Sequence, residues 1–563
     1  MSRVRFVHAL VGLAAAARAI SLAWLHPLNW DEIEYRRATA WVWNGLVPYR
    51  DFWEHHTPLQ WFVFAPIAAF AHGPGVSAIV ALRFAQTIVW AIAFVLLSAW
   101  MRNAGIGRFA RAAAILIALC SSMFMLAAVE YRVDALACAL LVTAILLAQR
   151  GMLFWCGISL VFAGLANLRL GPLLVVALIA FAIRRRDRIL QLAGGVAAAL
   201  AISAAYFAIT GSVAIAWQRL IVDNYLADHF ARRVPGIFVH RISMPFGATL
   251  SGFALSAIDP ATIVMLIVGV VGMVHAFVRR QPQFIVIAVI QIANIVFVAM
   301  MKFVQTYHFE TFFILMIPFV AMEIDRLQTG NAIVGALALL VAFSVAVSVF
   351  RGKEDDFQYQ DLIMREADRL TPVNGTVFDG AGWALNRKPA YRYWFLREIV
   401  HVLEEHGRFE PYRVDATNPP AALISDYGAR VWLATHPDLR RYFMSHYLPY
   451  WRDLWLPGMS AVISPGSRAT WTVPADGDYA IYASTSLTAH PWFRGDPTAF
   501  TRLGYGKAVR LKRGEPYTMA SNDARPIGVF IVPVGLNELF RQPPPGVDID
   551  AAPPPHWHVP QIW

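Results

Sequence analysis

Apolar runs separated by short polar turns dominate the first 350 residues. About 20 apolar residues carry a helix across a bilayer, so these runs predict membrane-spanning helices, the shorter ones extending into neighbouring loops. The runs lie at 7–25, 76–100, 109–129, 134–149, 152–168, 170–183, 189–210, 260–278, 284–300, 309–322 and 331–350. They predict about eleven transmembrane helices, the first an uncleaved anchor. Residues 58–72 are apolar for only about fifteen positions, and we expect a re-entrant or interfacial helix there.

Arginine clusters between these runs predict how the chain is oriented. Ten arginines and a single acid, Asp187, occupy alternate connections, which the positive-inside rule assigns to the cytoplasm. The arginines are Arg102, Arg108, Arg111, Arg150, Arg184, Arg185, Arg186, Arg188, Arg279 and Arg280. The N-terminus is then cytoplasmic, and everything after residue 350 lies on the outer face.

The chain becomes polar from residue 351 onward. A helical stretch at 354–370 and short strands at 374–378 and 421–426 predict a soluble α/β region. Short strands separated by turn dipeptides then predict a β-sandwich-like module, and proline tracts predict an extended tail. The expected parts are a membrane domain at 1–350, the α/β region at 351–450, the β-rich module at 451–545 and the tail at 546–563.

Composition agrees with a membrane protein. The chain is 58% hydrophobic and only 15% charged, whereas soluble chains carry about 25% charged residues. The net charge of +11 then reflects membrane orientation, and no nucleic-acid partner is expected. Three cysteines lie in apolar runs and are expected to be small core residues: Cys120, Cys138 and Cys156.

Ionisable residues gather at the span ends that this orientation places outside. Because charges at membrane depth are costly, several loops that bring them to one face predict a polar cavity. The alternative is that they are ordinary interfacial charges beside an aromatic belt. Two acidic segments weaken that alternative: Asp31-Glu32 and Arg132-Val133-Asp134. Both lie directly at predicted span ends, where an aromatic belt would contain Trp, Tyr or Lys instead of acids. Arg83 lies deep in a predicted span and is expected either to be paired or to snorkel, with a structural role in bracing the outer loops.

Three segments carry a resemblance to a known family. They are Asn29-Trp30-Asp31-Glu32-Ile33-Glu34-Tyr35, the stretch from Gly45 to Leu59 with G-x-x-P-Y-x-D and then Glu54-His55-His56-Thr57-Pro58-Leu59, and Glu130-Tyr131-Arg132-Val133-Asp134. Over roughly residues 1–350 the chain resembles the GT-C membrane glycosyltransferases, in particular the bacterial branch related to protein O-mannosyltransferases and lipid A aminoarabinose transferases. Relatives often carry Lys in a K-P-P-L pattern where this chain carries His56.

The resemblance implies an inverting transfer of sugar from a polyprenyl-phosphate donor to a hydroxyl acceptor on the periplasmic face of the bacterial inner membrane. The acceptor would be a lipid, a glycan or a protein. A hydroxyl that attacks an anomeric carbon needs a carboxylate to accept its proton, and the departing phosphate needs cations or hydrogen-bond donors. Asp31 would be the general base, with Glu32 as its neighbour and Asp134 orienting the acceptor or a cation.

The same resemblance implies a phosphate-binding set drawn from several loops. Its members would be His56, Arg132, Arg169 and Lys302, with Tyr307 and His308 as supporting donors. Arg169 and Lys302 have the alternative role of snorkelling anchors at span ends. A divalent metal stays open, because Glu54, His55 and His229 are acceptable Zn²⁺ or Mn²⁺ ligands but no H-E-x-x-H or similar spacing joins them.

Two other functions compete with the enzyme. A transporter or flippase of lipid-linked sugars would usually carry its polar residues near the bilayer midplane and in repeated halves, and neither feature is apparent in the sequence. An inactive scaffold is the third hypothesis, and Asp31 and Asp134 at the family's acidic positions argue against it. In the enzyme, the outer domain would position the acceptor. Its tryptophans suit stacking on sugars, although aromatic residues fill cores more often.

Overall fold

The computed structural model describes residues 26–70, 75–230, 260–300, 306–327, 330–351, 356–396, 398–414, 419–451, 453–484, 501–503, 508–520 and 524–534, with a few positions before residue 25. The chain divides into two units: residues 1–73 with 77–354, and residues 74–76 with 355–563. Lys302, the predicted tail at 546–563 and most of the apolar run at 7–25 lie outside the described residues.

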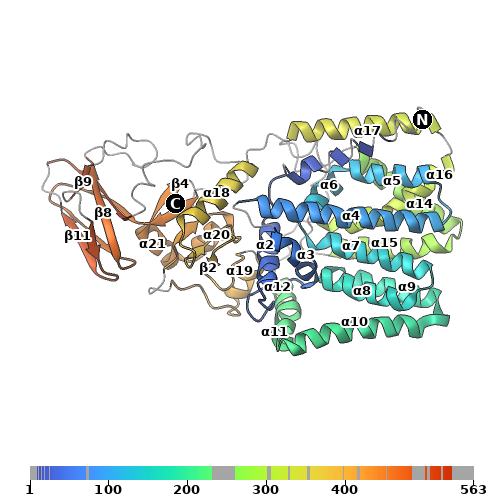
Figure 1. Ribbon diagram of the computed structural model, residues 1–563, viewed down its shortest axis with the longest axis horizontal. Helices are drawn as coiled ribbons and strands as arrows, with labels where there is room; N and C mark the ends of the chain where they lie inside the picture. The colour runs from blue at the N-terminus through green and yellow to red at the C-terminus, as the bar shows by residue number, and fades with distance from the viewer. Residues whose placement is uncertain are drawn as a thin grey trace. The chain divides into compact units, whose positions relative to one another are not determined.

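The first unit is a helical bundle whose long helices run alongside one another (Figure 1). Most of its long helices follow the predicted apolar runs, whereas the helices at residues 30–43 and 213–230 lie in segments that were predicted as outer loops. They are α2 (Trp30–Trp43), α3 (Leu59–Phe70), α4 (Ser77–Asn103), α5 (Arg108–Cys120), α6 (Ser122–Val129), α7 (Val133–Gln149), α8 (Leu153–Ala166), η1 (Leu168–Leu170), α9 (Gly171–Arg184), η2 (Arg186–Arg188), α10 (Ile189–Ile209), α11 (Val213–Trp217), η3 (Gln218–Asp223), α12 (Asn224–Phe230), α14 (Pro260–Val278), α15 (Pro282–Met300), η4 (Thr306–Phe309), α16 (Glu310–Leu327) and α17 (Gly330–Arg351).

One predicted span differs from the structure. The run at 109–129 forms two helices, α5 and α6, which are bent by 70° at Ser121. The Oγ of Ser121 accepts the N–H of Phe124, which caps α6, and lies 2.8 Å from Oγ1 of Thr262. A hydroxyl that bonds locally and across to a second helix offers the backbone an alternative to a continuous helix.

Among the described residues, five helices are long and apolar enough to cross a bilayer: α4, α10, α14, α15 and α16. The bent pair α5 and α6 makes a sixth if it is counted as one span, and α3, α7 and α8 are shorter apolar helices. The protein is therefore a polytopic α-helical membrane protein with strands in its C-terminal part, as predicted. The figure of about eleven spans stays a prediction.

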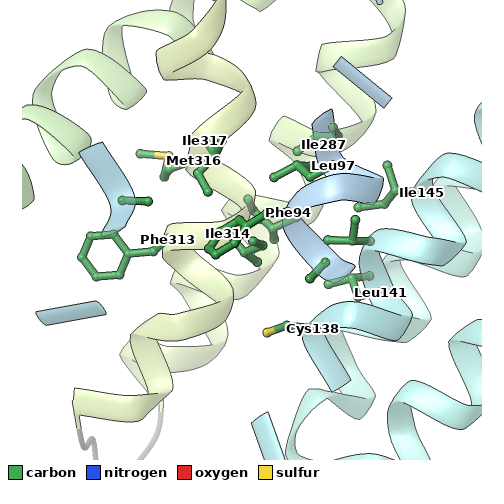
Figure 2. Packing of buried hydrophobic residues seen from close by; sticks show 14 of the residues in the cluster. Phe94, Leu97, Cys138, Leu141, Ile145, Ile287, Phe313, Ile314, Met316 and Ile317 are labelled. Carbon is green, nitrogen blue, oxygen red and sulfur yellow. The ribbon is translucent and has the colours of Figure 1, made fainter. Parts of the chain in front are cut away.

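A continuous apolar core joins these helices. Figure 2 shows Phe94 and Leu97 of α4, Leu141 of α7 and Ile287 of α15 beside side chains of α16 such as Ile314. All three cysteines are buried in this core, which confirms the prediction that they are small core residues.

The bundle places the predicted site residues at one end of its helices and the arginines of the predicted cytoplasmic connections at the other. Helices α4, α7, α9 and α16 begin at the end where α6 and α8 finish, so the connection from α6 to α7, the turn from α8 to α9 and the start of α16 meet there. Arg102, Arg150, Arg184 and Arg279 follow or lie near the opposite ends of α4, α7, α9 and α14. Connections rich in arginine and connections that carry the site residues therefore lie at opposite ends of the bundle, which is the alternation predicted from the sequence.

The second unit contains an α/β part and a β-rich part. Its helices and strands are α18 (Asp356–Leu370), β1 (Thr376–Phe378), β2 (Lys388–Pro389), α19 (Glu398–Glu405), β3 (Ala422–Ile424), α20 (Tyr427–Thr435), α21 (Pro437–His446), β4 (Tyr447–Trp451), β5 (Leu454–Pro457), β6 (Met459–Ile463), β7 (Arg468–Thr472), β8 (Gly477–Ser484), β9 (Thr501–Leu503), β10 (Val509–Leu511), β11 (Pro516–Ala520) and β12 (Ile527–Pro533). The first sheet has the order β2-β1-β3-β5-β4, in which β1 is parallel to β2 and β3.

The β-rich part packs two antiparallel sheets around one apolar cluster. One sheet has the order β10-β8-β12-β6 with β9 on β8, and the other pairs β11 with β7. Trp471 of β7 lies against Tyr479 of β8, with ring centroids 5.4 Å apart, and both belong to the same buried cluster as Ile531 of β12. Two sheets that share such a core form a sandwich-like arrangement.

Candidate active site

The start of α2 fixes the position of Asp31. Asn29 caps this helix: its Oδ1 accepts the N–H of Asp31, and in return Oε2 of Glu32 accepts the N–H of Asn29 at 2.9 Å. This reciprocal capping box satisfies backbone donors that a helix start would otherwise leave free. It also sets Asp31 in the first turn, where its side chain is 16% exposed.

Glu32 forms a buried ion pair with Arg83 of α4. The Arg83 guanidinium donates from Nε and Nη2 to the two carboxylate oxygens at 2.7 and 2.6 Å, and both side chains are fully buried. Arg83 also donates to the carbonyls of His26 and Pro27, so it is paired, as the first of its two expected states required, and it connects α4 to the segment before α2. Burial raises the pKa of Glu32, but Arg83 and backbone amides, including that of Tyr131, outweigh this effect and lower it.

Arg132 lies at the centre of the candidate site. Its Nη1 donates to Oδ2 of Asp31 at 2.8 Å, and its Nε lies 3.4 Å from Oδ2 of Asp134. Its Nη1 is also 3.5 Å from Glu130. The guanidinium carbon lies 3.4 Å from the ring centroid of Tyr307, which is a close cation–π arrangement. Arg132 therefore contacts both Asp31 and Asp134, the predicted general base and the acid predicted to orient the acceptor or a cation.

A second guanidinium lies on the same aromatic ring. The guanidinium carbon of Arg169 is 5.3 Å from the centroid of Tyr307. Among the described residues, Nη2 of Arg132 and Nη1 of Arg169 are buried and have no hydrogen-bond partner. His308 is buried beside Tyr307, with ring centroids 4.5 Å apart. The structure thus brings Arg132, Arg169 and Tyr307 together, whereas Lys302 lies outside the described residues.

Asn167 connects the second acid to Arg169. Its Nδ2 donates to Oδ1 of Asp134 at 2.8 Å, and its Oδ1 accepts the N–H of Arg169 at 3.1 Å. Asp134 is thus held by Arg132 on one side and by Asn167 on the other. The carboxylate is 5% exposed, and this arrangement positions both arginines relative to one another.

A separate group of ligating side chains forms where the loop before α3 meets α2. We call it the His–Glu cluster; its members are Glu34, Glu54, His55 and His56, whose ligand atoms all lie within 4.8 Å of one another. His56 lies 3.0 Å from Glu54 through Nδ1 and 3.2 Å from the hydroxyl of Tyr35 through Nε2. His229 is not a member; it stacks on Tyr225 of α12.

Electrostatics within the cluster follow from burial. Burial and the neighbouring charge of His55 lower the pKa of His56 to about 4. Burial raises the pKa of Glu54, but its interactions with His55 and His56 outweigh this and lower it. The sequence predicted that His56 helps to bind the donor phosphate, whereas its side-chain contacts in the structure are with Glu54 and Tyr35.

Sequence reasoning did not select two acids that lie in this region. Glu34 follows Asp31 by three positions, so the helical period could have placed it near the site. Glu310, the first residue of α16, is fully buried, and its two carboxylate oxygens have no hydrogen-bond partner within the described ranges. Its charge interacts with those of Asp134 and Arg132. An acid at a span end, as at Asp31, was the sequence signal for a polar cavity, and Glu310 carries the same signal.

Comparison with known proteins gives matches in structure only. No family model and no curated protein sequence matches the chain. Its structure is similar to the crystal structure of ArnT from Cupriavidus metallidurans bound to undecaprenyl phosphate, with 14% sequence identity and a TM-score of 0.51 over 82% of this chain and 94% of that one. The apo form of the same protein matches with 14% identity and a TM-score of 0.50, over 83% and 94% of the two chains. ArnT is the lipid A aminoarabinose transferase, and the chain described here has the GT-C fold that its sequence motifs predicted.

Proposed function

We propose that this protein is an inverting glycosyltransferase that moves a sugar from a polyprenyl-phosphate donor to a hydroxyl acceptor on the periplasmic face of the bacterial inner membrane. One arrangement carries the proposal: a partly exposed carboxylate, Asp31, is held 2.8 Å from the guanidinium of Arg132, which has a further N–H available for an anion. A proton acceptor and a phosphate-binding cation are thus fixed side by side.

The reaction needs these two groups in one place. The acceptor oxygen forms a bond to the anomeric carbon while the bond from that carbon to the phosphate oxygen breaks. The hydroxyl proton goes to Asp31 as general base, and the bonding electrons leave with the polyprenyl phosphate. Because attack and departure occur on opposite faces of the carbon, the anomeric configuration inverts.

Arg132 and Arg169 would bind the departing phosphate. A phosphate suits guanidinium groups because each presents several N–H donors in a planar fork. The free Nη2 of Arg132 and Nη1 of Arg169, both beside Tyr307, offer such donors. Charge that develops on the phosphate oxygen would be stabilised there without reorganisation of the site.

The remaining predicted residues take positioning roles in this proposal. Asp134 holds Arg132 and Asn167, and Glu32 holds Arg83 and the start of α2, so both act through their neighbours. Lys302 and His308 stay candidates for donor binding. The sugar transfer proposed here assigns no step to a metal ion; among the described residues, the His–Glu cluster offers ligands for one. The second unit would position the acceptor.

The position of the charged residues favours the enzyme over a flippase. A flippase needs polar residues along a path through the membrane, near its midplane. Asp31, Arg132 and Arg169 instead lie in the first turn of α2 or in connections between helices. By the positive-inside rule, the arginines at the opposite helix ends support an outer location for the end of the bundle that carries the site.

Analysis of bound lipid tests the donor directly. Mass spectrometry of lipids that co-purify with the full-length protein is expected to find a polyprenyl phosphate or its glycosylated form. Incubation with that glycosylated lipid and candidate acceptors should then release free polyprenyl phosphate. Donor turnover that is absent with polyprenyl-phosphate sugars of every tested kind, from a folded preparation, would overturn the proposal.

A further inference from the structure

The His–Glu cluster has the composition and spacing of a metal site, and the sugar-transfer proposal does not use it. We propose that its four side chains bind one divalent transition metal ion, with Zn²⁺ as the best fit. Two imidazoles and two carboxylates form a mixed N₂O₂ ligand set that Zn²⁺ accepts. The cluster differs from the set expected from sequence, because Glu34 and His56 join it and His229 does not.

The spacing of the ligand atoms suits a tetrahedral ion. Bonds of about 2.0–2.2 Å to zinc separate two ligand atoms of a tetrahedron by about 3.3–3.6 Å. Nδ1 of His55 lies 3.5 Å from Oε1 of Glu34 and 3.4 Å from Oε1 of Glu54. Nδ1 of His56 lies 3.7 and 3.0 Å from the same two oxygens. All four distances lie within a few tenths of an ångström of the tetrahedral value.

Burial of the two acids supports an ion between them. The carboxylates of Glu34 and Glu54 are both fully buried, and both approach the same pair of imidazoles. Oε2 of Glu54 has no hydrogen-bond partner among the residues that the structure describes. Buried carboxylates that share a site are costly unless a cation neutralises them, and a divalent ion would do so for both.

Neighbouring side chains hold the histidines in the required orientation. Nε2 of His56 lies 3.2 Å from the hydroxyl of Tyr35, so a proton on Nε2 leaves Nδ1 free to bind a metal. Trp53 stacks on His55 with centroids 5.2 Å apart, and Nδ2 of Asn224 donates to the carbonyl of His55 at 2.9 Å. Metal-binding histidines commonly have supporting contacts of this kind.

The ion would fasten the loop before α3 to α2. Glu34 belongs to α2, whereas the other three ligands follow one another in the loop. Tyr35, which contacts His56, also lies beside Arg132, whose guanidinium carbon is 5.8 Å from its ring centroid. The metal would therefore fix the wall of the candidate active site that carries Tyr35.

The test measures metal content rather than sugar transfer, so that it can fail independently of the proposed function. Full-length protein in detergent is stripped with a chelator, incubated with Zn²⁺, desalted and analysed by elemental mass spectrometry. The expected result is one zinc per chain. Glu54→Gln and His55→Asn should each abolish stoichiometric binding. His229→Asn, a histidine of the same region outside the cluster, is the matched control and should keep one zinc per chain.

Two further measurements keep the test decisive if a variant folds poorly. Co²⁺ loaded into the wild-type protein should give the visible absorption of a four-coordinate ion with nitrogen and oxygen ligands. Tyr35→Phe, which removes only the support of His56, should weaken zinc binding by about 10-fold. Less than stoichiometric zinc in folded wild-type protein, or zinc that persists in both Glu54→Gln and His55→Asn, would overturn the proposal.

Discussion

Nη1 of Arg132 lies 2.8 Å from Oδ2 of Asp31, although 101 positions separate the two residues along the chain. The same guanidinium reaches Asp134 and covers the ring of Tyr307. Four segments of the chain therefore meet at one charged group: the start of α2, the turn before α7, the first turn of α7 and η4. Arg132 couples the proposed base to the proposed phosphate site.

Arg169→Ala should weaken donor use without unfolding the protein. Loss of a hydrogen bond to a charged group costs about 1.5–3 kcal/mol, so the KM for the polyprenyl-phosphate sugar should rise by about 10- to 100-fold. Steady-state kinetics on the purified protein measure this. Arg184→Ala, at the other end of α9, is the control and should leave KM unchanged. Equal KM values for wild type and Arg169→Ala would return Arg169 to the role of a snorkelling anchor.

Glu32→Gln should destabilise the fold, because it leaves the buried guanidinium of Arg83 without its anion. Removal of one partner from a buried ion pair costs about 3–5 kcal/mol, so Tm in detergent should fall clearly. Arg50→Ala breaks the exposed pair with Asp51 and should change stability by less than about 1 kcal/mol. An unchanged Tm for Glu32→Gln would contradict the bracing role of this pair.

The stability of the second unit should depend on Asp426. Burial, together with the charge of Asp379, raises the pKa of Asp426 to about 7. A carboxyl whose pKa is higher in the folded chain than in the unfolded chain stabilises the fold fully below the unfolded value of about 4, and this contribution is lost as the pH rises through about 7. We therefore expect Tm to fall between about pH 4 and about pH 7.

Tryptophan fluorescence can follow this transition, because Nε1 of Trp383 donates to Oδ2 of Asp426 at 2.8 Å. Thermal unfolding of the full-length protein is measured at several pH values and compared with Asp426→Asn, which cannot titrate there. The variant should show a flatter profile over this range. The same slope in both proteins would assign the pH dependence to other groups.

The helical part of the fold was predictable because apolar length and arginine position are direct consequences of the bilayer. Predicted runs such as 189–210 and 260–278 agree closely with α10 and α14. The bend at Ser121 was not predictable, because it depends on a hydroxyl contact with Thr262, 141 positions away. Hydropathy depends on residue type alone and carries no information on such a contact, so the residues of α5 and α6 form one apolar run in the sequence.

For the candidate site, the positions of the acids were easier to predict from the sequence than the cations that pair with them. Asp31 and Asp134 lie directly at helix starts, where a charge stands out in the sequence. The cation that pairs with each acid depends on tertiary packing. Arg83, for example, is 51 positions from Glu32 in the sequence and donates to both of its carboxylate oxygens. His56 illustrates the same limit, because a motif position does not say which way an imidazole turns, and this one contacts Glu54.

Asp31→Asn tests the central claim most directly. The amide keeps the size of the side chain and an oxygen for Arg132 but cannot accept the acceptor's proton. With full-length protein and its polyprenyl-phosphate sugar, we expect sugar transfer to fall by at least about 10²-fold, while donor binding and Tm stay close to those of the wild type. Transfer at the wild-type rate in a folded Asp31→Asn protein would show that Asp31 is not the base and would contradict this account.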